Sequence, residues 1–471
     1  MDAGRTRAGW RAALWIVAAL TVARLAALWL TPLELFTDES QYWLWGQHPA
    51  FGYYSKPPLI GWTIGAATAI LGDHAWSVRL PAPLLHAATA VLTGCAAARL
   101  DPRLAGPAML AYATLPMTAA GSFLISTDTV MLPFLAGALW LWLPRPPGPG
   151  RAFAAGLLVG VGMLAKYAAI YAVGGAALAA LLVPALRPLG RAALAAGTGV
   201  LLGLAPNLLW NVAAGFVTLR HTAENAGALD GRLDLRLAGP LRFLAEQLGV
   251  LGPVLFPALL VAALVALVRP RARPEWMLLA SLALVPVALV TAQAATAEAN
   301  ANWAVAGYAA GTILAVAALG PRLRALSLAV NGTLCAALIA ATAAPGLMPD
   351  RLRAQVFGRY EGRAEVAAAV LSAAREAGLD TVVAEDRALL ADLFWTGRDG
   401  PAALRAVPVA GPPPHHYAMA FPLEPEGGDV LLAAARVPGC ARPLGRLTPD
   451  SGAYRGRTIH LSRAARGCVL P

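Results

Sequence analysis

The sequence predicts an all-α domain that crosses a membrane about eleven times, followed by a small α+β domain outside the membrane. Three observations lead to this fold class. Of the 471 residues, 58% are hydrophobic and 13% are charged, whereas a soluble protein of this length carries about 25% charged residues. Apolar runs of about 17–25 residues follow one another along the chain. After about residue 346 these runs stop and charged residues become frequent.

Each apolar run is long enough to cross the hydrocarbon core of a bilayer as a helix. We expect the spans near 10–31, 80–98, 104–124, 128–144, 152–168, 169–186, 192–212, 243–268, 275–293, 303–320 and 325–345. The two spans on either side of Lys166 require one continuous apolar run to be split. Together the spans make residues 1–345 the predicted membrane domain.

Arginines gather in every second connection between these spans. These connections are the segments 5–11, 99–103, 145–151, 187–191, 269–273 and 322–324. By the positive-inside rule they are cytoplasmic, so the N-terminus is inside and the C-terminal domain is outside. The same loops account for the formal net charge of +11. The basic composition therefore reports membrane orientation and gives no support to a nucleic-acid partner.

Three polar stretches lie outside the spans. Two are the outer loops 32–79 and 213–241, and the third is the α+β domain at 346–471. In this domain the pattern TVVAEDRALLADLFW indicates a short buried strand followed by a helix. Cys440 and Cys468 fit either a disulfide or two free thiols, because spacing alone does not establish the pairing. His415 and His416 follow three prolines, which indicates a surface turn.

The first outer loop carries the densest polar cluster of the membrane half, FTDESQYWLW followed by GYYSKPP. The adjacent acids Asp38 and Glu39 lie near the membrane interface, where partial loss of water raises the cost of charge. Thr37 or Asp38 could cap a short helix, but a cap explains only one acid. Lys56 is one of only two lysines, and its compact ammonium could contact a phosphate. We therefore predict a functional site in this loop.

Two further charges lie at or within predicted spans. Asp128 follows Ser126 and Thr127 ahead of an apolar run, so it is either a helix cap or a functional acid. Lys166 lies inside an apolar run, where it either extends its amine to the interface or binds an anion.

The second outer loop and its surroundings offer further polar candidates. His221 and Glu224 are three residues apart, on one face of a helix. They could be half of a metal site or an acid–base pair, although a hydrogen-bonded interfacial helix is the favoured alternative. Amides and an indole that could line a polar cavity follow at Asn300, Asn302 and Trp303.

The segment DESQYWLWGQHPAFGYYSKPPLIGW resembles the first outer loop of the family 39 glycosyltransferases. These are GT-C-fold enzymes related to protein O-mannosyltransferases and to lipid A aminoarabinose transferases. Five later segments are similar to the bacterial members: ISTDTVMLPF, GMLAKYAAIY, PNLLWNVAAGFVTLRHTAENAG, EQLGVLGPV and NANWAVAGY. The resemblance covers about residues 10–320.

This resemblance implies a multi-pass enzyme of the bacterial inner membrane. It would move a sugar from a polyprenyl-phosphate carrier to an acceptor on the periplasmic face. Lipid A, lipopolysaccharide core, another envelope glycan and protein are the acceptors that stay open. Asp38 and Glu39 match the family's first acidic motif, with Asp38 the expected catalytic carboxylate. Asp128 matches the second acidic position, and Lys56 matches the lysine that contacts phosphate.

Sugar transfer from a lipid phosphate builds negative charge on the departing phosphate, which nearby cations stabilise. The acceptor hydroxyl needs a base, and a single base with no covalent intermediate implies inversion at the anomeric carbon. The candidate substrate-binding residues are Lys56, Tyr53, Tyr54, Lys166, Arg220, His221, Glu224, Asn225 and Arg242. Some lipid A transferases have a metal-binding acid just before the lysine. Ser55 stands there in this chain, so we expect no required cofactor, with a divalent metal as the alternative.

Two other classes of protein compete with a transferase. A proton-coupled transporter or lipid flippase would also place Asp and Lys within membrane spans, but transporters often show internal repeats and charges near the midplane. An assembly factor that uses its spans only as an anchor would not need the acid pair and the Lys-Pro-Pro loop. Both alternatives explain the clustering of acids at the outer face less well than an enzyme does.

Overall fold

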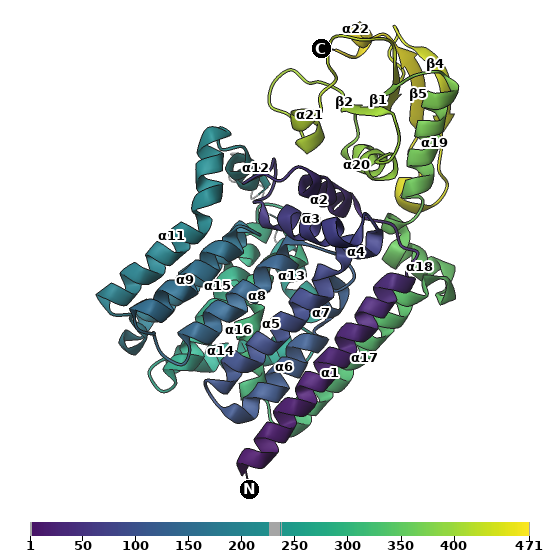
Figure 1. Cartoon of the computed structure of the whole chain (residues 1–471). Coiled ribbons are helices and arrows are strands. Elements are labelled where there is room, and N and C mark those ends of the chain that lie inside the picture. The colour runs from purple at the N-terminus through teal and green to yellow at the C-terminus, as the bar shows by residue number, and fades with distance from the viewer. Residues whose placement is uncertain (1, 226–235, 237, 471) are drawn as a thin grey trace.

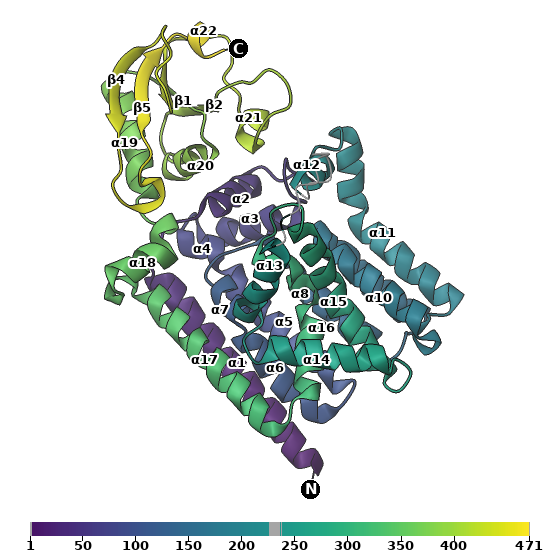
Figure 2. The ribbon, with the colours of Figure 1, turned by 180° about the vertical axis from the view of Figure 1, so that it is seen from behind.

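The computed structural model describes residues 2–225, 236 and 238–470. A bundle of helices forms the body of the molecule, and a domain of helices and strands covers one end of it (Figure 1). α1 (Asp2–Leu30) and α17 (Pro321–Ala343) lie side by side along one edge of the bundle in both the front and the back view (Figure 2). This architecture confirms the predicted fold class.

Each expected span coincides with one helix of the bundle or with a pair of helices. Besides α1 and α17 these are α5 (Pro81–Ala98), α6 (Ala105–Thr114), α7 (Pro116–Gly121), α8 (Thr127–Trp142), α9 (Pro149–Met163), α10 (Ile170–Leu182), α11 (Gly190–Ala213), α13 (Ala238–Val250), α14 (Leu255–Val268), α15 (Pro274–Ala294) and α16 (Tyr308–Ala318). Within the described residues, six helices are long and apolar enough to cross a membrane singly, or seven if one bent pair is counted. The other apolar helices are shorter or interrupted.

One predicted span is broken in the middle. α13 and α14 are bent by 113° relative to each other. The break lies at Gly252, whose φ is 105°, and at Pro253, which has no backbone N–H to continue a helix. The prediction of a continuous span over 243–268 is therefore wrong.

The first outer loop, residues 32–79, folds into three helices and is called the first outer segment from here on. α2 (Thr37–Gln47), α3 (Leu59–Leu71) and α4 (Ala75–Arg79) lie between the bundle and the C-terminal domain (Figures 1 and 2). The N-cap of α2 is Phe36, with an extended backbone. The alternative that Thr37 or Asp38 caps this helix is therefore wrong, and Asp38 is available for another role.

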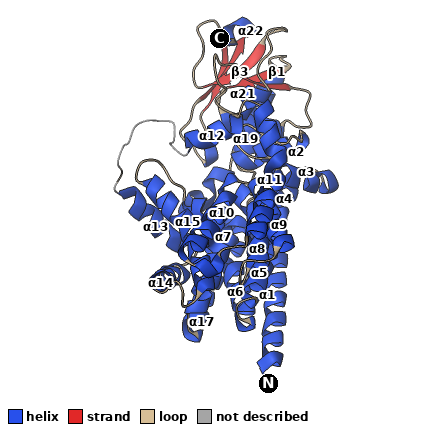
Figure 3. Ribbon diagram, turned by 90° about the vertical axis from the view of Figure 1, so that its left-hand side faces the viewer, coloured by secondary structure: helices blue, strands red, loops and turns tan. Residues whose placement is uncertain are grey.

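The C-terminal domain contains one mixed sheet with the strand order β2-β1-β3-β5-β4 (red in Figure 3). The strands are β1 (Thr381–Ala384), β2 (Ala403–Ala406), β3 (Val430–Ala434), β4 (Arg442–Leu447) and β5 (Ile459–Ala464). β1 pairs in parallel with β2 and β3, whereas β5 is antiparallel to β3 and β4. The helices α19 (Arg363–Glu376) and α20 (Arg387–Thr396) flank β1 in the chain. Cys440 and Cys468 form a disulfide, which decides between the two alternatives left by the sequence.

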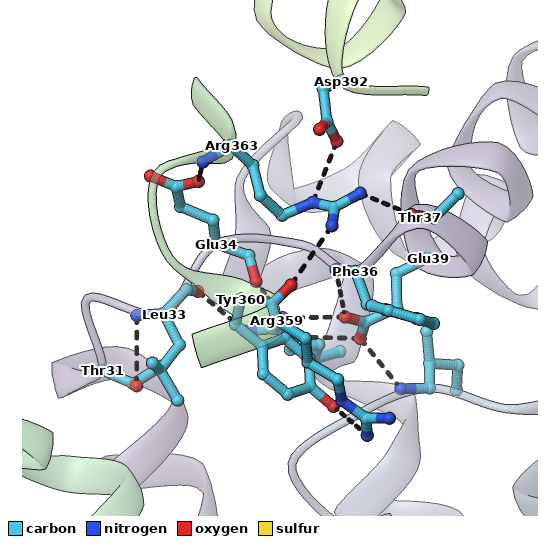
Figure 4. Close-up of polar contacts among 12 residues, drawn as sticks. Thr31, Leu33, Glu34, Phe36, Thr37, Glu39, Arg359, Tyr360, Arg363 and Asp392 are labelled. Atoms are coloured by element: carbon cyan, nitrogen blue, oxygen red, sulfur yellow. Dashed lines mark hydrogen bonds and ion pairs between the residues drawn. The ribbon is translucent and has the colours of Figure 1, made fainter. Parts of the chain in front are cut away.

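Charged residues join the C-terminal domain to the segment between α1 and α2 (Figure 4). The carboxylate of Glu34 accepts a hydrogen bond from the backbone N–H of Arg363 at 2.6 Å. The guanidinium of Arg363 donates to Asp392 at 3.0 Å and also to the hydroxyl of Thr37. Arg363 and Asp392 are only 4% and 3% exposed, so the junction is a buried polar network that fixes the domain over α2.

An apolar core continues across the same junction. Trp45 of the first outer segment and Leu389 of the C-terminal domain belong to one buried cluster. His416 packs edge-on against Trp45 with ring centroids 5.5 Å apart, and burial lowers the pKa of His416 to about 3. His415 caps α21 (His416–Ala420) by accepting a hydrogen bond from the N–H of Ala418. The prediction that the two histidines lie in a surface turn is therefore wrong.

The buried ion pair of the junction gives a prediction about stability. Burial raises the pKa of Asp392 to about 6, against the opposing effect of Arg363, so above that pH both partners are charged. There we expect Arg363→Ala to lower the free energy of unfolding by about 3–5 kcal/mol, because it leaves a buried carboxylate without its cation. Thermal unfolding of the purified protein in detergent measures the effect.

The matched control is Arg457→Ala. Arg457 pairs with Asp386 at 3.4 Å, but both side chains are about half exposed, and such a pair contributes about 0–1 kcal/mol. An Arg363→Ala variant that unfolds at the same temperature as this control would contradict the structural role of the junction.

Candidate active site

Asp38 lies in the first turn of α2 and contacts the C-terminal domain. Its carboxylate forms an ion pair with Nη2 of Arg387, the first residue of α20. Nε of Arg387 donates to Oε1 of Gln41 at 2.9 Å, so one guanidinium contacts two residues on the same face of α2. The side chains of Arg387 and Asp38 keep 40% and 42% of their surface exposed. The pair is therefore accessible to a substrate.

Asp128 is the second carboxylate of the site and lies at the start of α8. The cap of this helix is Ser126, whose hydroxyl accepts a hydrogen bond from the N–H of Thr129, so the capping alternative for Asp128 is wrong. Asp128 instead accepts hydrogen bonds at 2.7 Å from Nζ of Lys166 and at 2.7 Å from the amide of Asn302. Three segments far apart in the sequence therefore meet at this carboxylate.

A break in the helices brings Lys166 to Asp128. α9 ends at Met163, Lys166 has an extended backbone, and a short 3-10 turn at Tyr167–Ala169 leads into α10. The apolar run is thus split where the predicted spans required it. The Lys166 side chain is 19% exposed and forms an ion pair with Asp128. Its ammonium is bound within the protein, which differs from the alternative that the side chain extends to the interface.

Lys56 lies in the connection between α2 and α3 and is half-buried. Burial lowers the pKa of Lys56, and the positive charge of Lys166 lowers it further, whereas Asp38 and Asp128 act in the opposite direction. The charges of both acidic positions therefore reach the same ammonium. Lys56 forms no ion pair with any of the residues that the structure describes, so it is the cation of the cluster that is not already bound to a carboxylate.

Glu39 has different surroundings from Asp38, although the two are adjacent. Its carboxylate accepts two hydrogen bonds from the guanidinium of Arg79, at 2.9 and 2.8 Å. It also accepts hydrogen bonds from the N–H groups of Phe36 at 3.0 Å and Ile125 at 3.1 Å. Glu39 and Arg79 are each 1% exposed. These contacts leave Glu39 no access to a substrate and indicate that it positions α2.

Tyr53 and Tyr54 precede Lys56 in the same connection. The ring of Tyr53 stacks on Trp45 with centroids 4.5 Å apart, and its hydroxyl lies 2.7 Å from the Trp45 carbonyl oxygen. The hydroxyl also accepts the N–H of Ala50 at 3.1 Å, and burial raises the pKa of Tyr53 to about 12. Tyr53 therefore shapes the loop that carries Lys56, whereas the ring of Tyr54 lies against His221 at 4.9 Å.

α11 and the helix that follows it, α12 (Val217–Asn225), support the same loop from the other side. Nδ2 of Asn207 donates to the carbonyl oxygen of Phe51 at 2.8 Å. The hydroxyl of Thr218 donates to the backbone carbonyl oxygen of Tyr53 at 2.6 Å. Gly52 passes so close to Trp210 that a Cβ on it would lie 2.2 Å from the indole. The Gly-Tyr-Tyr sequence is thus required by packing as well as by any contact with substrate.

The remaining candidates lie at different distances from this cluster. Arg220 and His221 are on α12 (Val217–Asn225), where Arg220 is exposed. The side chains of Glu224 and Asn225 lie outside the described part of the chain. Arg242 is paired with Glu246 at 2.9 Å on the surface of α13. No group of three potential metal ligands occurs among the described His, Cys, Asp and Glu residues.

Sequence reasoning missed the contributions of Arg387 and Gln41. Arg387 follows the cap residue Asp386 of α20, and nothing in its local pattern connects it with a residue at the other end of the chain. Tyr42 was also missed: it is buried, and burial together with the charge of Asp38 raises its pKa. The amide of Asn302, predicted to line a polar cavity, donates to Asp128.

The cluster combines an accessible carboxylate with cations that can bind an anion. Asp38 can accept a proton, since its surroundings leave it partly open. Lys56 can stabilise negative charge on a leaving group. Lys166 and Asn302 fix Asp128 in one orientation. This arrangement suits the transfer of a group from an anionic donor to a weak nucleophile.

Comparisons with known proteins agree with this chemistry. Residues 55–210 match the dolichyl-phosphate-mannose-protein mannosyltransferase family. Over 475 residues, covering 98% of the chain and 99% of the relative, the sequence is 37% identical to the lipid A galacturonosyltransferase RgtD of Rhizobium johnstonii.

The fold is similar to two crystal structures of ArnT from Cupriavidus metallidurans. The apo structure has a TM-score of 0.65 and 15% identity, with 99% of both chains covered. The structure with undecaprenyl phosphate has a TM-score of 0.64 and 16% identity, with 97% of this chain and 99% of the other covered. At these identities the likeness establishes the fold alone.

Proposed function

Because the chain belongs to the family 39 glycosyltransferases, we propose that it transfers galacturonic acid from a polyprenyl-phosphate carrier to lipid A. The chain is a multi-pass membrane glycosyltransferase with a lipid-linked sugar donor. The sugar and the acceptor are taken from the curated relative, whose sequence aligns with nearly the whole chain. A transporter or flippase is no longer a competing function, because the family is one of transferases.

The observation that carries the proposal is the convergence of Asp38, Asp128, Lys56 and Lys166 on one site. These residues come from the first outer segment, α8 and the break between α9 and α10. The electrostatic effect of the other three on Lys56 follows from their closeness to it. A leaving phosphate and a deprotonating base must lie within one sugar ring of each other, and the electrostatic effect of Asp38 on Lys56 supports such an arrangement.

In the proposed reaction, Asp38 accepts the proton of an acceptor hydroxyl as its oxygen bonds to the anomeric carbon. The bond between that carbon and the phosphate oxygen breaks, and the phosphate leaves with the electron pair as polyprenyl phosphate. Lys56 stabilises the charge that grows on the phosphate. Asp128 positions the ammonium of Lys166 beside the leaving phosphate. One displacement with one base inverts the configuration of the anomeric carbon.

We further propose that residues 1–345 are the membrane domain and 346–471 a periplasmic domain, with the N-terminus in the cytoplasm. The disulfide between Cys440 and Cys468 supports this placement of the C-terminal domain, since disulfides persist in oxidising compartments such as the periplasm. The arginine-rich connections support the cytoplasmic position of the opposite end.

A transfer assay tests the function. The purified full chain is incubated with radiolabelled polyprenyl-phosphate-galacturonic acid and with lipid A, and labelled lipid A is separated and counted. We expect label in lipid A and release of polyprenyl phosphate. Transfer to lipopolysaccharide core or to protein, with none to lipid A, would overturn the assigned acceptor.

The environment of Lys56 predicts how donor binding depends on pH. Only the ammonium form attracts a phosphate, and burial together with Lys166 lowers the pKa of Lys56 from its ordinary value of 10.5. Binding of polyprenyl phosphate should therefore weaken with rising pH earlier than for an ordinary lysine. Titration of the dissociation constant against pH measures this loss.

Lys56→Arg is the matched variant for this prediction. Its guanidinium keeps its charge to far higher pH, so binding should persist into the alkaline range where the wild-type protein loses it. Identical pH profiles for the two proteins would show that another group controls the titration.

A further inference from the structure

We infer that Arg387 selects a sugar that carries a carboxylate, by binding this carboxylate in exchange for Asp38. The inference rests on the proposed function, because it concerns the sugar bound at the same site. Its starting point is a contradiction in the resting structure. Asp38 is the proposed base, yet its carboxylate forms an ion pair with the guanidinium of Arg387. The oxygen that accepts this charged hydrogen bond, Oδ1, is not free to take up the proton of an acceptor hydroxyl.

Oδ1 of Asp38 is released when another anion takes its place on Arg387. The other cations of the cluster have assigned partners, since Lys166 is bound to Asp128 and Lys56 is positioned for the phosphate. The C6 carboxylate of a uronic acid is on the same ring as the anomeric carbon at which Asp38 acts. It can therefore reach a guanidinium that contacts Asp38.

Arg387 is placed to make this exchange without moving away. Its Nε is bound to Gln41 at 2.9 Å, which keeps the guanidinium beside α2 when the contact with Asp38 is lost. Its Nη1 makes no hydrogen bond to any described residue, and its side chain is 40% exposed. Nη1 and Nη2 together form the planar fork that binds a carboxylate through two parallel hydrogen bonds.

A neutral sugar cannot bring about the same exchange. Its hydroxyl groups carry no charge and compete poorly with a carboxylate for a guanidinium. The donor would still bind through its phosphate, but Asp38 would stay paired. Selection therefore acts on the rate of transfer and less on donor binding, as expected when the correct substrate completes the catalytic site.

The bond changes of the transfer are those proposed above, with one addition. The sugar carboxylate binds Arg387 before the acceptor hydroxyl gives its proton to Asp38. After transfer the sugar leaves with the acceptor, and Arg387 pairs again with Asp38. No oxidant, reductant or further reactant is involved.

Donor selectivity tests the inference. Purified wild-type protein and Arg387→Gln are each given polyprenyl-phosphate-galacturonic acid and polyprenyl-phosphate-galactose, with lipid A as acceptor. We expect the wild-type protein to prefer the uronic acid. In Arg387→Gln the preference should fall by about 10–100-fold, which is the effect of losing a charged hydrogen-bond partner. Transfer of galactose should rise, because Asp38 is no longer paired.

Two further variants make the result decisive. Arg405→Gln is the control: Arg405 is another arginine of the C-terminal domain, half-buried and 3.8 Å from Glu424, and its loss should leave the preference unchanged. Arg387→Lys keeps the charge but lacks the fork, so its preference should lie between those of wild type and Arg387→Gln. It also provides the test if the glutamine variant does not fold.

The outcomes separate the inference from the proposed function. Equal loss of transfer from both donors in Arg387→Gln would overturn the inference and leave galacturonosyl transfer established. A wild-type protein that transfers galactose and not galacturonic acid would overturn the proposed sugar, and the inference with it.

Discussion

Asp38→Asn should lower the rate of sugar transfer by about 10²–10⁴-fold, the usual contribution of a general base. The amide cannot accept the proton of the acceptor hydroxyl, whereas its size matches that of the carboxylate. Asp38 is partly exposed and lies at the edge of the buried core, so the variant should fold. Initial rates with saturating donor, together with thermal unfolding, measure both properties.

Asp73→Asn is the matched control for this variant. Asp73 is another acid of the first outer segment, and it accepts a hydrogen bond from the indole of Trp43 at 2.7 Å. It lies outside the cluster around Lys56, so its loss should change the rate far less. An Asp38→Asn protein that folds and keeps a transfer rate near that of Asp73→Asn would remove Asp38 from the role of base.

Glu39→Ala should destabilise the protein by about 3–5 kcal/mol, the cost of removing one partner of a buried ion pair. The substitution leaves the guanidinium of Arg79 in the core, 1% exposed, without its carboxylate. It also removes the acceptor for the N–H groups of Phe36 and Ile125. We expect a much lower thermal midpoint in detergent and poor accumulation in the membrane.

The contrast with an exposed pair makes this result specific. Glu246→Ala breaks the surface pair with Arg242, whose side chain is 82% exposed, and an i,i+4 pair of this kind contributes about 0.3–0.5 kcal/mol. Replacing both buried partners with apolar residues, as in Glu39→Leu with Arg79→Met, should restore part of the stability. If Glu39→Ala were fully stable but inactive, Glu39 would be a catalytic residue and not a positioning one.

Asp38 and Glu39 show which part of the site the sequence predicts and which part it does not. Asp38 and Glu39 are adjacent and match the same motif, so the sequence placed both in the catalytic group. Helical geometry turns successive side chains by about 100°, and this rotation directs Asp38 toward Arg387 and Glu39 into the core. The sequence pattern alone does not show in which direction each of the two side chains points, because that depends on where the helix begins and on what packs against it.

More of the fold than of the site could be predicted from the sequence. Apolar runs of the length of a bilayer located nearly every helix of the bundle, because a helix of that length and composition is what a bilayer requires. The break at Gly252 and the helices α3 and α4 of the first outer segment depend on packing against neighbours and were not predicted, whereas a short helix near α2 was one of the alternatives. Arg387 was missed for a related reason: its partner Asp38 is 349 positions away, and one sequence holds no signal for such a contact.

The same separation sets the order in which this enzyme becomes active. Asp38 leaves the ribosome early and Arg387 near the end of synthesis, and with the proposed topology the second must also be exported before it can fold. A nascent or truncated chain that ends before α20 therefore holds Lys56, Lys166 and Asp38 but lacks the guanidinium that contacts Asp38.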